Sequence, residues 1–217
     1  MRRILLLALL ASGCSTSADS VPTTGRFRAV VWADNWFSFS LGETSVFEDS
    51  VPFTTERSFN KESFGFDGDF PLVLNFVVKD YKANDTGLEY IDTRRQQMGD
   101  GGFIAQIKDM TTGQYVAVTN SAWKCLVIHR APLDTSCEKS DAPDAACTAR
   151  IDAEPAGWKS VGFDARAWPA AVEYAPAAVD PKMGYDEVDW AASARLIWSS
   201  SLKQDNTLLC RLVVNLP

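Results

Sequence analysis

The chain has 217 residues, of which 46% are hydrophobic and 11% aromatic, and this is enough for one domain with a sizeable core. Its formal net charge is −7, and such an acidic chain is a poor partner for nucleic acid. After the N-terminus, no stretch reaches the about 18 apolar residues that a membrane-spanning helix needs.

Residues 1–13 have the pattern of a bacterial export signal. Two arginines are followed by the apolar run 4–10, which is too short to span a bilayer, and by three small residues before Cys14. Residues 14–25, rich in Ser and Thr, are predicted to form a flexible tether, and residues 26–217 a single domain. Removal of the signal leaves 19 basic against 28 acidic residues, a formal charge of −9.

The small residues before Cys14 resemble the lipobox of bacterial lipoproteins, in which this cysteine is acylated and becomes the new N-terminus. The resemblance implies a protein of the cell envelope, held at a membrane through lipid on Cys14. Ser15 resembles the outer-membrane sorting pattern, if the host is Gram-negative. The alternative is an ordinary secretory signal with a chance cysteine.

Strand patterns recur from Phe27 onward, and helical periodicity is nearly absent. Residues 109–113 have the spacing of a hairpin turn. Many short antiparallel strands with such turns predict an all-β jelly-roll sandwich. The strands are predicted at residues 37–41, 72–79, 102–108, 114–119, 121–128, 194–198 and 207–214. The predicted core consists of Phe39, Leu72, Leu74, Phe76, Phe103, Ile107, Leu196 and Leu209.

Four cysteines besides Cys14 lie in a chain predicted to enter an oxidising compartment, which favours two disulfides. Three pairings are possible. Cys137 and Cys147 bracket a polar loop, so we favour this pair, which leaves Cys125 for Cys210. Metal ligation is disfavoured, because the cysteines lack zinc-type spacing and companion histidines.

Several motifs resemble, in their order along the chain, the galactose-binding-like jelly rolls attached to rhamnosidases and other glycoside hydrolases. The family opens with a pattern "ADNxFxLxVNG" and later has "GGLIA", "SWK" and "GW…FDDSxWxxA" segments. The resemblance covers nearly all of the predicted mature chain and implies a galactose-binding-like β-sandwich. It transfers architecture better than function, because loops carry ligand specificity in this fold. The matching segments are Ala33-Asp34-Asn35-Trp36-Phe37, Gly102-Phe103-Ile104-Ala105, Ser121-Ala122-Trp123-Lys124, Gly157-Trp158 and residues 163–170.

Two long interruptions, residues 81–101 and 131–157, exceed the usual loop length in a compact domain. The first mixes aromatic and planar polar side chains, the combination that recognises the C–H face and the hydroxyls of a sugar. The alternative is a self-packed surface loop. The candidate ligand-binding residues are Tyr81, Tyr90, Arg94, Arg95 and Gln96, with Tyr185 as a second-rank candidate.

Catalytic patterns are weak. His129 is the only histidine, no GxSxG or HExxH motif is present, and we expect it to be exposed or to support a loop. Asp67 and Asp69 could ligate a structural calcium ion in a turn, although solvated turn residues are the alternative. Asp34 and Asn35 are expected to be turn formers.

The sequence therefore predicts a non-catalytic carbohydrate-binding module that is tethered to the envelope and binds polysaccharide. The competing interpretation is a structural or protein-interaction lipoprotein, and a hydrolase is less favoured because the usual motifs are missing.

Overall fold

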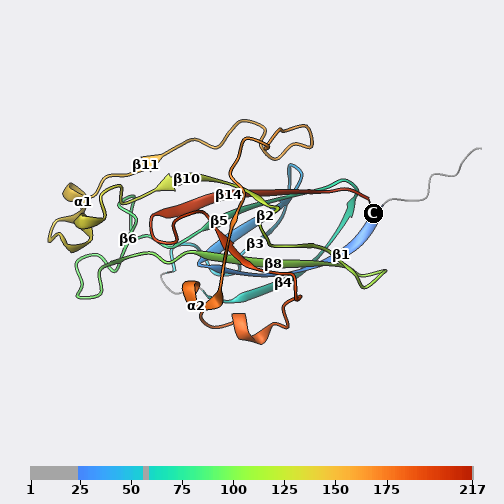
Figure 1. Cartoon of the computed structure of the whole chain (residues 1–217), viewed down its shortest axis with the longest axis horizontal. Helices are drawn as coiled ribbons and strands as arrows, with labels where there is room; N and C mark the ends of the chain where they lie inside the picture. Colours follow the sequence, from blue (N-terminus) through green and yellow to red (C-terminus); the bar gives the residue numbers. More distant parts are fainter. Residues whose placement is uncertain (1–23, 56–58, 217) are drawn as a thin grey trace, which may run out of the picture.

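The computed structural model of the chain describes residues 24–55 and 59–216. It is an all-β sandwich of two antiparallel sheets packed together (Figure 1). The predicted signal peptide, Cys14 and most of the predicted tether lie outside the described residues. The first strand begins at Thr24, so the last two residues of the predicted tether belong to the sandwich.

Sheet A has the strand order β12-β13-β8-β1-β4, and β9 also pairs with β8. Its strands are β1 (Thr24–Asp34), β4 (Lys61–Asp69), β8 (Gly102–Asp109), β9 (Tyr115–Val118), β12 (Val172–Tyr174) and β13 (Leu196–Trp198).

Sheet B has the order β11-β10-β14-β5-β2-β3. Its strands are β2 (Trp36–Leu41), β3 (Thr44–Glu48), β5 (Leu72–Lys79), β10 (Lys124–Arg130), β11 (Arg150–Ile151) and β14 (Asp205–Val214). The short elements are β6 (Leu88–Glu89), β7 (Gln97–Met98), α1 (Pro143–Ala146), α2 (Pro176–Val179) and two 3-10 turns, η1 (Thr135–Lys139) and η2 (Tyr185–Glu187).

The main core lies between the inner faces of the two sheets. Strand alternation sends Phe39 and Phe76 of sheet B inward, where their ring centroids are 4.7 Å apart. Phe76 also meets Phe103 of sheet A at 4.9 Å, which joins the two layers. All eight predicted core residues are buried. Leu196 and Leu209 nevertheless belong to separate clusters on the outer faces, because the segments 176–191 and 152–171 cover those faces.

Most predicted strands are confirmed, and the hairpin turn at residues 109–113 joins β8 to β9. Among the longer strands, β1, β3 and β4 were not among those predicted, and β4 includes Asp67 and Asp69. These residues were assigned to a turn, but they lie in a strand paired with β1, where Asp67 faces Arg26 and Asp69 faces Thr24. The buried positions of β4 are Phe64, Phe66 and Gly68. Because Gly68 has no apolar side chain, it obscured the alternation in the sequence.

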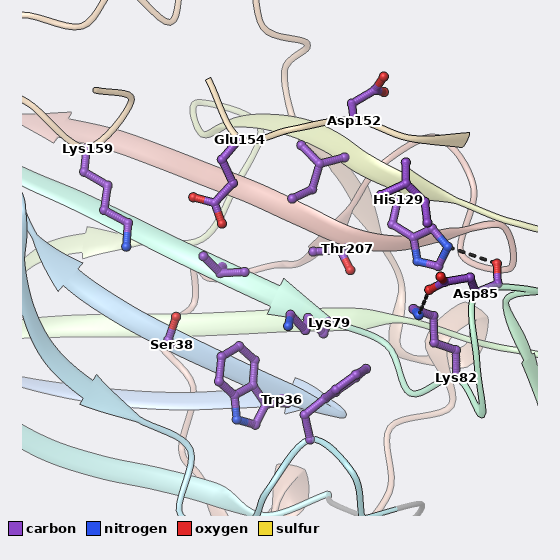
Figure 2. Close-up of a pocket in the computed structure, with 14 residues that line it drawn as sticks. Trp36, Ser38, Lys79, Lys82, Asp85, His129, Asp152, Glu154, Lys159 and Thr207 are labelled. Carbon is purple, nitrogen blue, oxygen red and sulfur yellow. Dashed lines mark hydrogen bonds and ion pairs between the residues drawn. The ribbon is translucent and has the colours of Figure 1, made fainter. Parts of the chain in front are cut away.

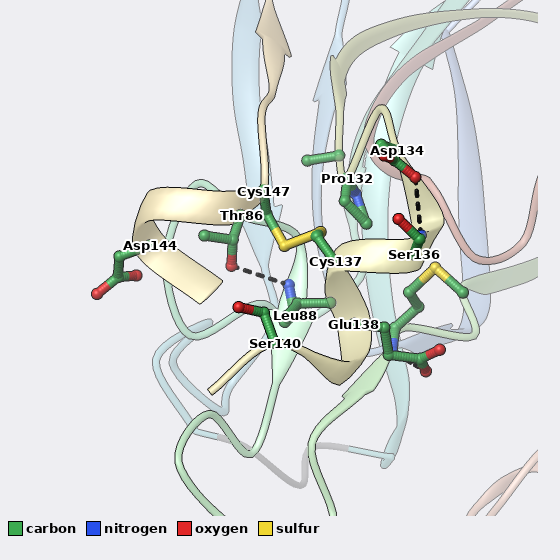
Figure 3. Close-up of a disulfide and its surroundings, with 12 residues drawn as sticks. Thr86, Leu88, Pro132, Asp134, Ser136, Cys137, Glu138, Ser140, Asp144 and Cys147 are labelled. Atoms are coloured by element: carbon green, nitrogen blue, oxygen red, sulfur yellow. Dashed lines mark hydrogen bonds between the residues drawn. A yellow bond between two sulfur atoms is a disulfide. The ribbon is translucent and has the colours of Figure 1, made fainter. Parts of the chain in front are cut away.

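The two long interruptions are not structureless, and they pack against each other. Residues 81–101 contain the two-stranded β6–β7 ribbon, and residues 131–157 contain η1, α1 and β11. Leu88 of β6 is fully buried in a cluster with Cys137 and Cys147 (Figure 3). The disulfide loop thus supplies the apolar surface that the short ribbon needs.

Both predicted disulfides are present. Cys125 and Cys210 occupy directly opposed positions on β10 and β14, and Cys137 is joined to Cys147. No helix formed by the described residues is long and apolar enough to cross a membrane.

The sequence separations of the disulfides, 85 and 10 residues, predict unequal contributions to stability. By loop-closure entropy, the longer loop contributes about 4–5 kcal/mol and the shorter about 3 kcal/mol. We expect the double variant Cys125→Ala/Cys210→Ala to lose more free energy of unfolding in urea titrations than Cys137→Ala/Cys147→Ala. A larger loss from the second pair would contradict this expectation.

Candidate functional site

One row of residues crosses the outer face of sheet B. In the strand register, Trp36 of β2 lies opposite Lys79 of β5, which lies opposite Thr207 of β14. Thr207 is paired in turn with His129 of β10, and His129 with Ile151 of β11. Five strands therefore each place one residue on the same line, and all five residues line one groove (Figure 2).

The groove exists because residues 152–171 cover only part of this face. Trp158 and Trp168 of that segment pack over Trp36, Val77 and Leu209. Arg211 of β14 fixes the segment through hydrogen bonds from its guanidinium to the carbonyl oxygens of Trp158 (3.2 Å) and Ser160 (2.8 Å). These buried contacts hold the segment as one wall of the groove.

The groove has a volume of about 420 Å³, and its lining mixes apolar side chains, among them Trp36 and Phe53, with polar and charged ones. The Lys79 ammonium lies 5.1 Å from the ring centroid of Trp36 and 4.9 Å from that of Phe53, which comes from the loop after β3. Burial, assisted by the nearby charge of Lys82, lowers the pKa of Lys79 from its ordinary value. A cation held over aromatic rings is a feature of many ligand-binding surfaces.

Some charged groups that line the groove already have a hydrogen-bond or ion-pair partner, and others have none in the part of the chain that the structure describes. Asp85 pairs with Lys82 at 2.8 Å, and Glu154 accepts a hydrogen bond from the indole of Trp158 at 2.7 Å. The ammonium groups of Lys79 and Lys159 have no carboxylate within 4.0 Å among the described residues. The groove therefore offers two cations that a ligand could pair with.

His129 supports a loop, as one of the sequence alternatives held, but it is not exposed. Its side chain is 4% exposed, and Nε2 lies 3.2 Å from the carbonyl oxygen of Asp85 (Figure 2). Since a carbonyl only accepts, Nε2 carries the proton and donates. Burial and then the charge of Lys82 lower the pKa of His129, so the ring is neutral at pH 7.

The predicted ligand-binding residues of the 81–101 loop do not converge on this groove. Tyr81 packs its ring 6.2 Å from Phe53 at the groove's edge, whereas Arg95 stacks 4.4 Å over Tyr90. Arg94 and Gln96 line a second hollow of about 600 Å³, whose lining contains no aromatic side chain. The amide of Gln96 is already bonded to two carbonyl oxygens of the disulfide loop, those of Glu138 and Ser140.

Tyr185 lies on the other side of the sandwich, over the outer face of sheet A. Its ring packs against Trp32 at 5.8 Å and against Trp190 at the same distance. Burial raises its pKa above the ordinary value. It is therefore distant in the fold from the residues with which it was grouped.

A separate group of carboxylates lies where the two sheets meet. Asp34 ends β1, Asp80 directly follows β5, and Asp100 precedes β8. One carboxylate oxygen from each lies within 4.8 Å of the others. Asp34 is 1% exposed and Asp80 is fully buried, and neither has a hydrogen-bond partner for its carboxylate oxygens among the described residues.

The electrostatics of this acidic cluster are unfavourable for charged carboxylates. Burial, reinforced by Asp100 and Glu89, raises the pKa of Asp34 well above its ordinary value. Burial, reinforced by Asp34, likewise raises the pKa of Asp80. Burial also raises the pKa of Asp100. Carboxyl groups whose pKa values are shifted in this way often lie at functional sites, so Asp34, Asp80 and Asp100 are candidate functional residues.

Sequence reasoning took Asp34 for a turn former and did not single out Asp80 or Asp100. Asn35 does lie at the bend between β1 and β2, but its side chain does not serve the local backbone: its oxygen accepts the backbone N–H of Tyr81, 46 residues away, at 2.5 Å. The available signal was an aspartate beside each of three predicted strands: Asp80 directly follows the strand 72–79, and Asp34 and Asp100 stand two or three residues before the strands 37–41 and 102–108. Its meaning depended on which strand ends meet.

The predicted calcium ligands Asp67 and Asp69 lie elsewhere, exposed on β4. Asp67 is 3.5 Å from the guanidinium of Arg26, and Asp69 accepts a hydrogen bond from Thr24. Among the described residues, neither belongs to a group of three or more potential ligands close enough to share an ion.

Comparisons with known proteins give no match: no family model fits the chain, and neither a curated protein nor a solved structure is significantly similar. The fold class therefore rests on the structure itself.

The state of His129 predicts a specific pH dependence. Because its folded pKa is lowered, protonation of the unfolded chain costs stability as the pH falls below the ordinary histidine value. The variant His129→Gln keeps a donor for the Asp85 carbonyl but cannot titrate. The free energy of unfolding of the wild type relative to this variant should fall between pH 7.5 and pH 5. A constant difference in urea titrations at the two pH values would exclude this origin.

Proposed function

We propose that this chain is a non-catalytic carbohydrate-binding protein tethered to the cell envelope, and that the groove on sheet B holds the sugar. The observation that carries the proposal is the row across five strands, which lines a groove where apolar and aromatic side chains lie beside polar and charged ones. Concave sites of this make-up are the usual ligand sites of proteins. The galactose-binding-like resemblance of the sequence is consistent with it.

The charges of the groove favour a sugar that carries an acid group. Lys79 and Lys159 are the two cations of the groove without a carboxylate partner in the described chain, whereas Lys82 is paired. A uronic-acid carboxylate would supply the missing partner, and the sugar ring would lie against the apolar side chains of the groove. Charge-assisted hydrogen bonds of this kind are stronger than neutral ones.

The groove is preferred to the 81–101 loop for a physical reason. The hollow beside Arg94 has no aromatic face against which the C–H surface of a sugar could stack. The binding role is preferred to hydrolysis because His129 is buried and engaged with a carbonyl, which leaves it poorly placed to act as an accessible base.

Affinity electrophoresis tests the proposal with a uronic-acid polysaccharide and its carboxyl-reduced derivative, which keeps the same linkages without the charge. We expect the wild type to be retarded by the first polymer and much less by the second. Lys79→Met and Lys159→Met should each weaken retardation about tenfold or more, the cost of one charge-assisted hydrogen bond.

The matched controls are Tyr90→Ala and Arg94→Ala in the loop. They should bind like the wild type if the groove holds the sugar. Loss of binding in these variants alone would move the site to the loop, as the sequence suggested. Absence of binding to every polysaccharide tested would overturn the carbohydrate proposal, and release of reducing sugar would overturn its non-catalytic part.

The membrane tether is tested separately. In a bacterial host, the wild-type chain should incorporate labelled palmitate and partition into the detergent phase, because acyl chains dominate the transfer. Cys14→Ser should abolish the label and leave the chain in the aqueous phase. A labelled Cys14→Ser variant, or an unlabelled wild type, would contradict lipidation at this residue.

A further inference from the structure

The acidic cluster at the end of the sandwich carries an inference that is independent of sugar binding. Three carboxylates, those of Asp34, Asp80 and Asp100, bring oxygens within 4.8 Å of one another from two different sheets. We propose that these residues bind one calcium ion, which joins the ends of β1 and β5 to the start of β8.

The first support is that the buried carboxylate oxygens of Asp34 and Asp80 lack hydrogen-bond partners among the described residues. Both carboxylate oxygens of Asp34 and both of Asp80 are inaccessible and make no hydrogen bond of normal geometry in the described chain. The backbone N–H of Gly101 faces Asp80, but its hydrogen bond goes to the carbonyl of Leu202. Buried carboxylates are normally paired, hydrogen-bonded or bound to a metal. The nearby Lys182 does not take this role, because its ammonium is bonded to Asp180 and its side chain is 40% exposed.

The second support is the shape of the backbone around the cluster. A Cβ atom on Gly99 would lie 1.8 Å from Oδ2 of Asp80, so only glycine lets the chain pass this close to the carboxylate. Two residues later the N–H of Gly101 is bonded to the carbonyl of Leu202 at 3.0 Å, which holds this segment in place. The intervening Asp100 is thereby directed at the other two aspartates.

The nature of the ligands selects the ion. All three ligands are carboxylate oxygens, which suit hard divalent cations rather than zinc or copper. Calcium accepts irregular sets of six to eight oxygens at about 2.3–2.6 Å, so one ion can span oxygens separated by nearly 5 Å. Magnesium demands shorter bonds and near-octahedral geometry, which an irregular set drawn from three strand ends does not favour.

The ion would act as a clamp on the 81–101 segment. Asp80 immediately precedes this segment and Asp100 lies at its end, so one ion would fix both of its ends. Asn35, next to Asp34, already holds the N–H of Tyr81. Calcium should therefore order the segment, including Lys82 and Asp85 at the edge of the groove.

The experiment is titration of calcium into chelator-treated protein, followed by calorimetry and thermal unfolding. We expect one ion per chain and a rise in Tm of about 5–10 °C at calcium 100-fold above Kd. Magnesium should bind more weakly. Proteolysis within residues 81–101 should slow when calcium is added.

Asp80→Asn is the diagnostic variant, because it keeps the shape and removes one buried charge. It should lose the calcium-induced rise in Tm, yet unfold at a higher temperature than the wild type in chelator. Asp34→Asn provides the same test if Asp80→Asn does not fold. The matched control, Asp67→Asn/Asp69→Asn, removes two exposed carboxylates and should keep the full calcium response.

Several outcomes would overturn the proposal. They are an unchanged Tm at millimolar calcium, a calcium response that persists in both cluster variants, and a response lost in the Asp67/Asp69 control. Equal affinity for magnesium would overturn the assignment to calcium. None of these measurements involves a sugar, so failure of the carbohydrate proposal leaves this one standing, and the reverse also holds.

Discussion

The register of β5 against its two neighbours is the constraint on which the other features depend. Phe76 lies opposite Phe39 on one side and Cys210 on the other, and all three point into the core. Since successive side chains of a strand face opposite sides, a slip of one residue would bring Val77 inward and turn Phe76 outward. The same slip would turn Lys79 away from the outer face, so that it would no longer line up with Trp36 and Thr207. One register thus sets both the core and the groove.

The outer face of sheet B shows how a strand with two apolar faces is accommodated. Val77 on that face is buried by Trp158 and Trp168 of the covering segment, just as Phe76 is buried by sheet A. The covering segment lacks long strands of its own, so its carbonyls need donors from the sheet. Arg211 and Asn75, both nearly inaccessible, supply these donors. Buried polar groups that are fully satisfied hold such a segment in one arrangement.

The acidic cluster shows the opposite situation, in which buried polar groups lack partners. Arg211 donates to three oxygens in the structure, whereas the carboxylates of Asp34 and Asp80 accept from none of the described residues. The carboxylates of Asp34 and Asp80 therefore need a partner that the described residues do not supply, and we propose that a cation from solvent is that partner.

The sequence alone predicted the fold class, seven of the fourteen strands that the described residues form, and the pairing of the cysteines that we favoured among three. Alternating apolar residues and Gly-containing turns are local signals, and four cysteines have only three ways to form two disulfides. Two local patterns led to wrong predictions: Gly68 obscured the alternation of β4, and the side chains of Asp34 and Asn35 were expected to serve only the bend in which they lie. The tertiary structure alone decided which residues form sites. Lys79 and His129 become neighbours only through pairing with β14, and Asp34, Asp80 and Asp100 meet only because strands of two sheets end at the same place. Sequence spacing carries no record of such long-range pairing, because it depends on strand order and on the packing of one sheet against the other.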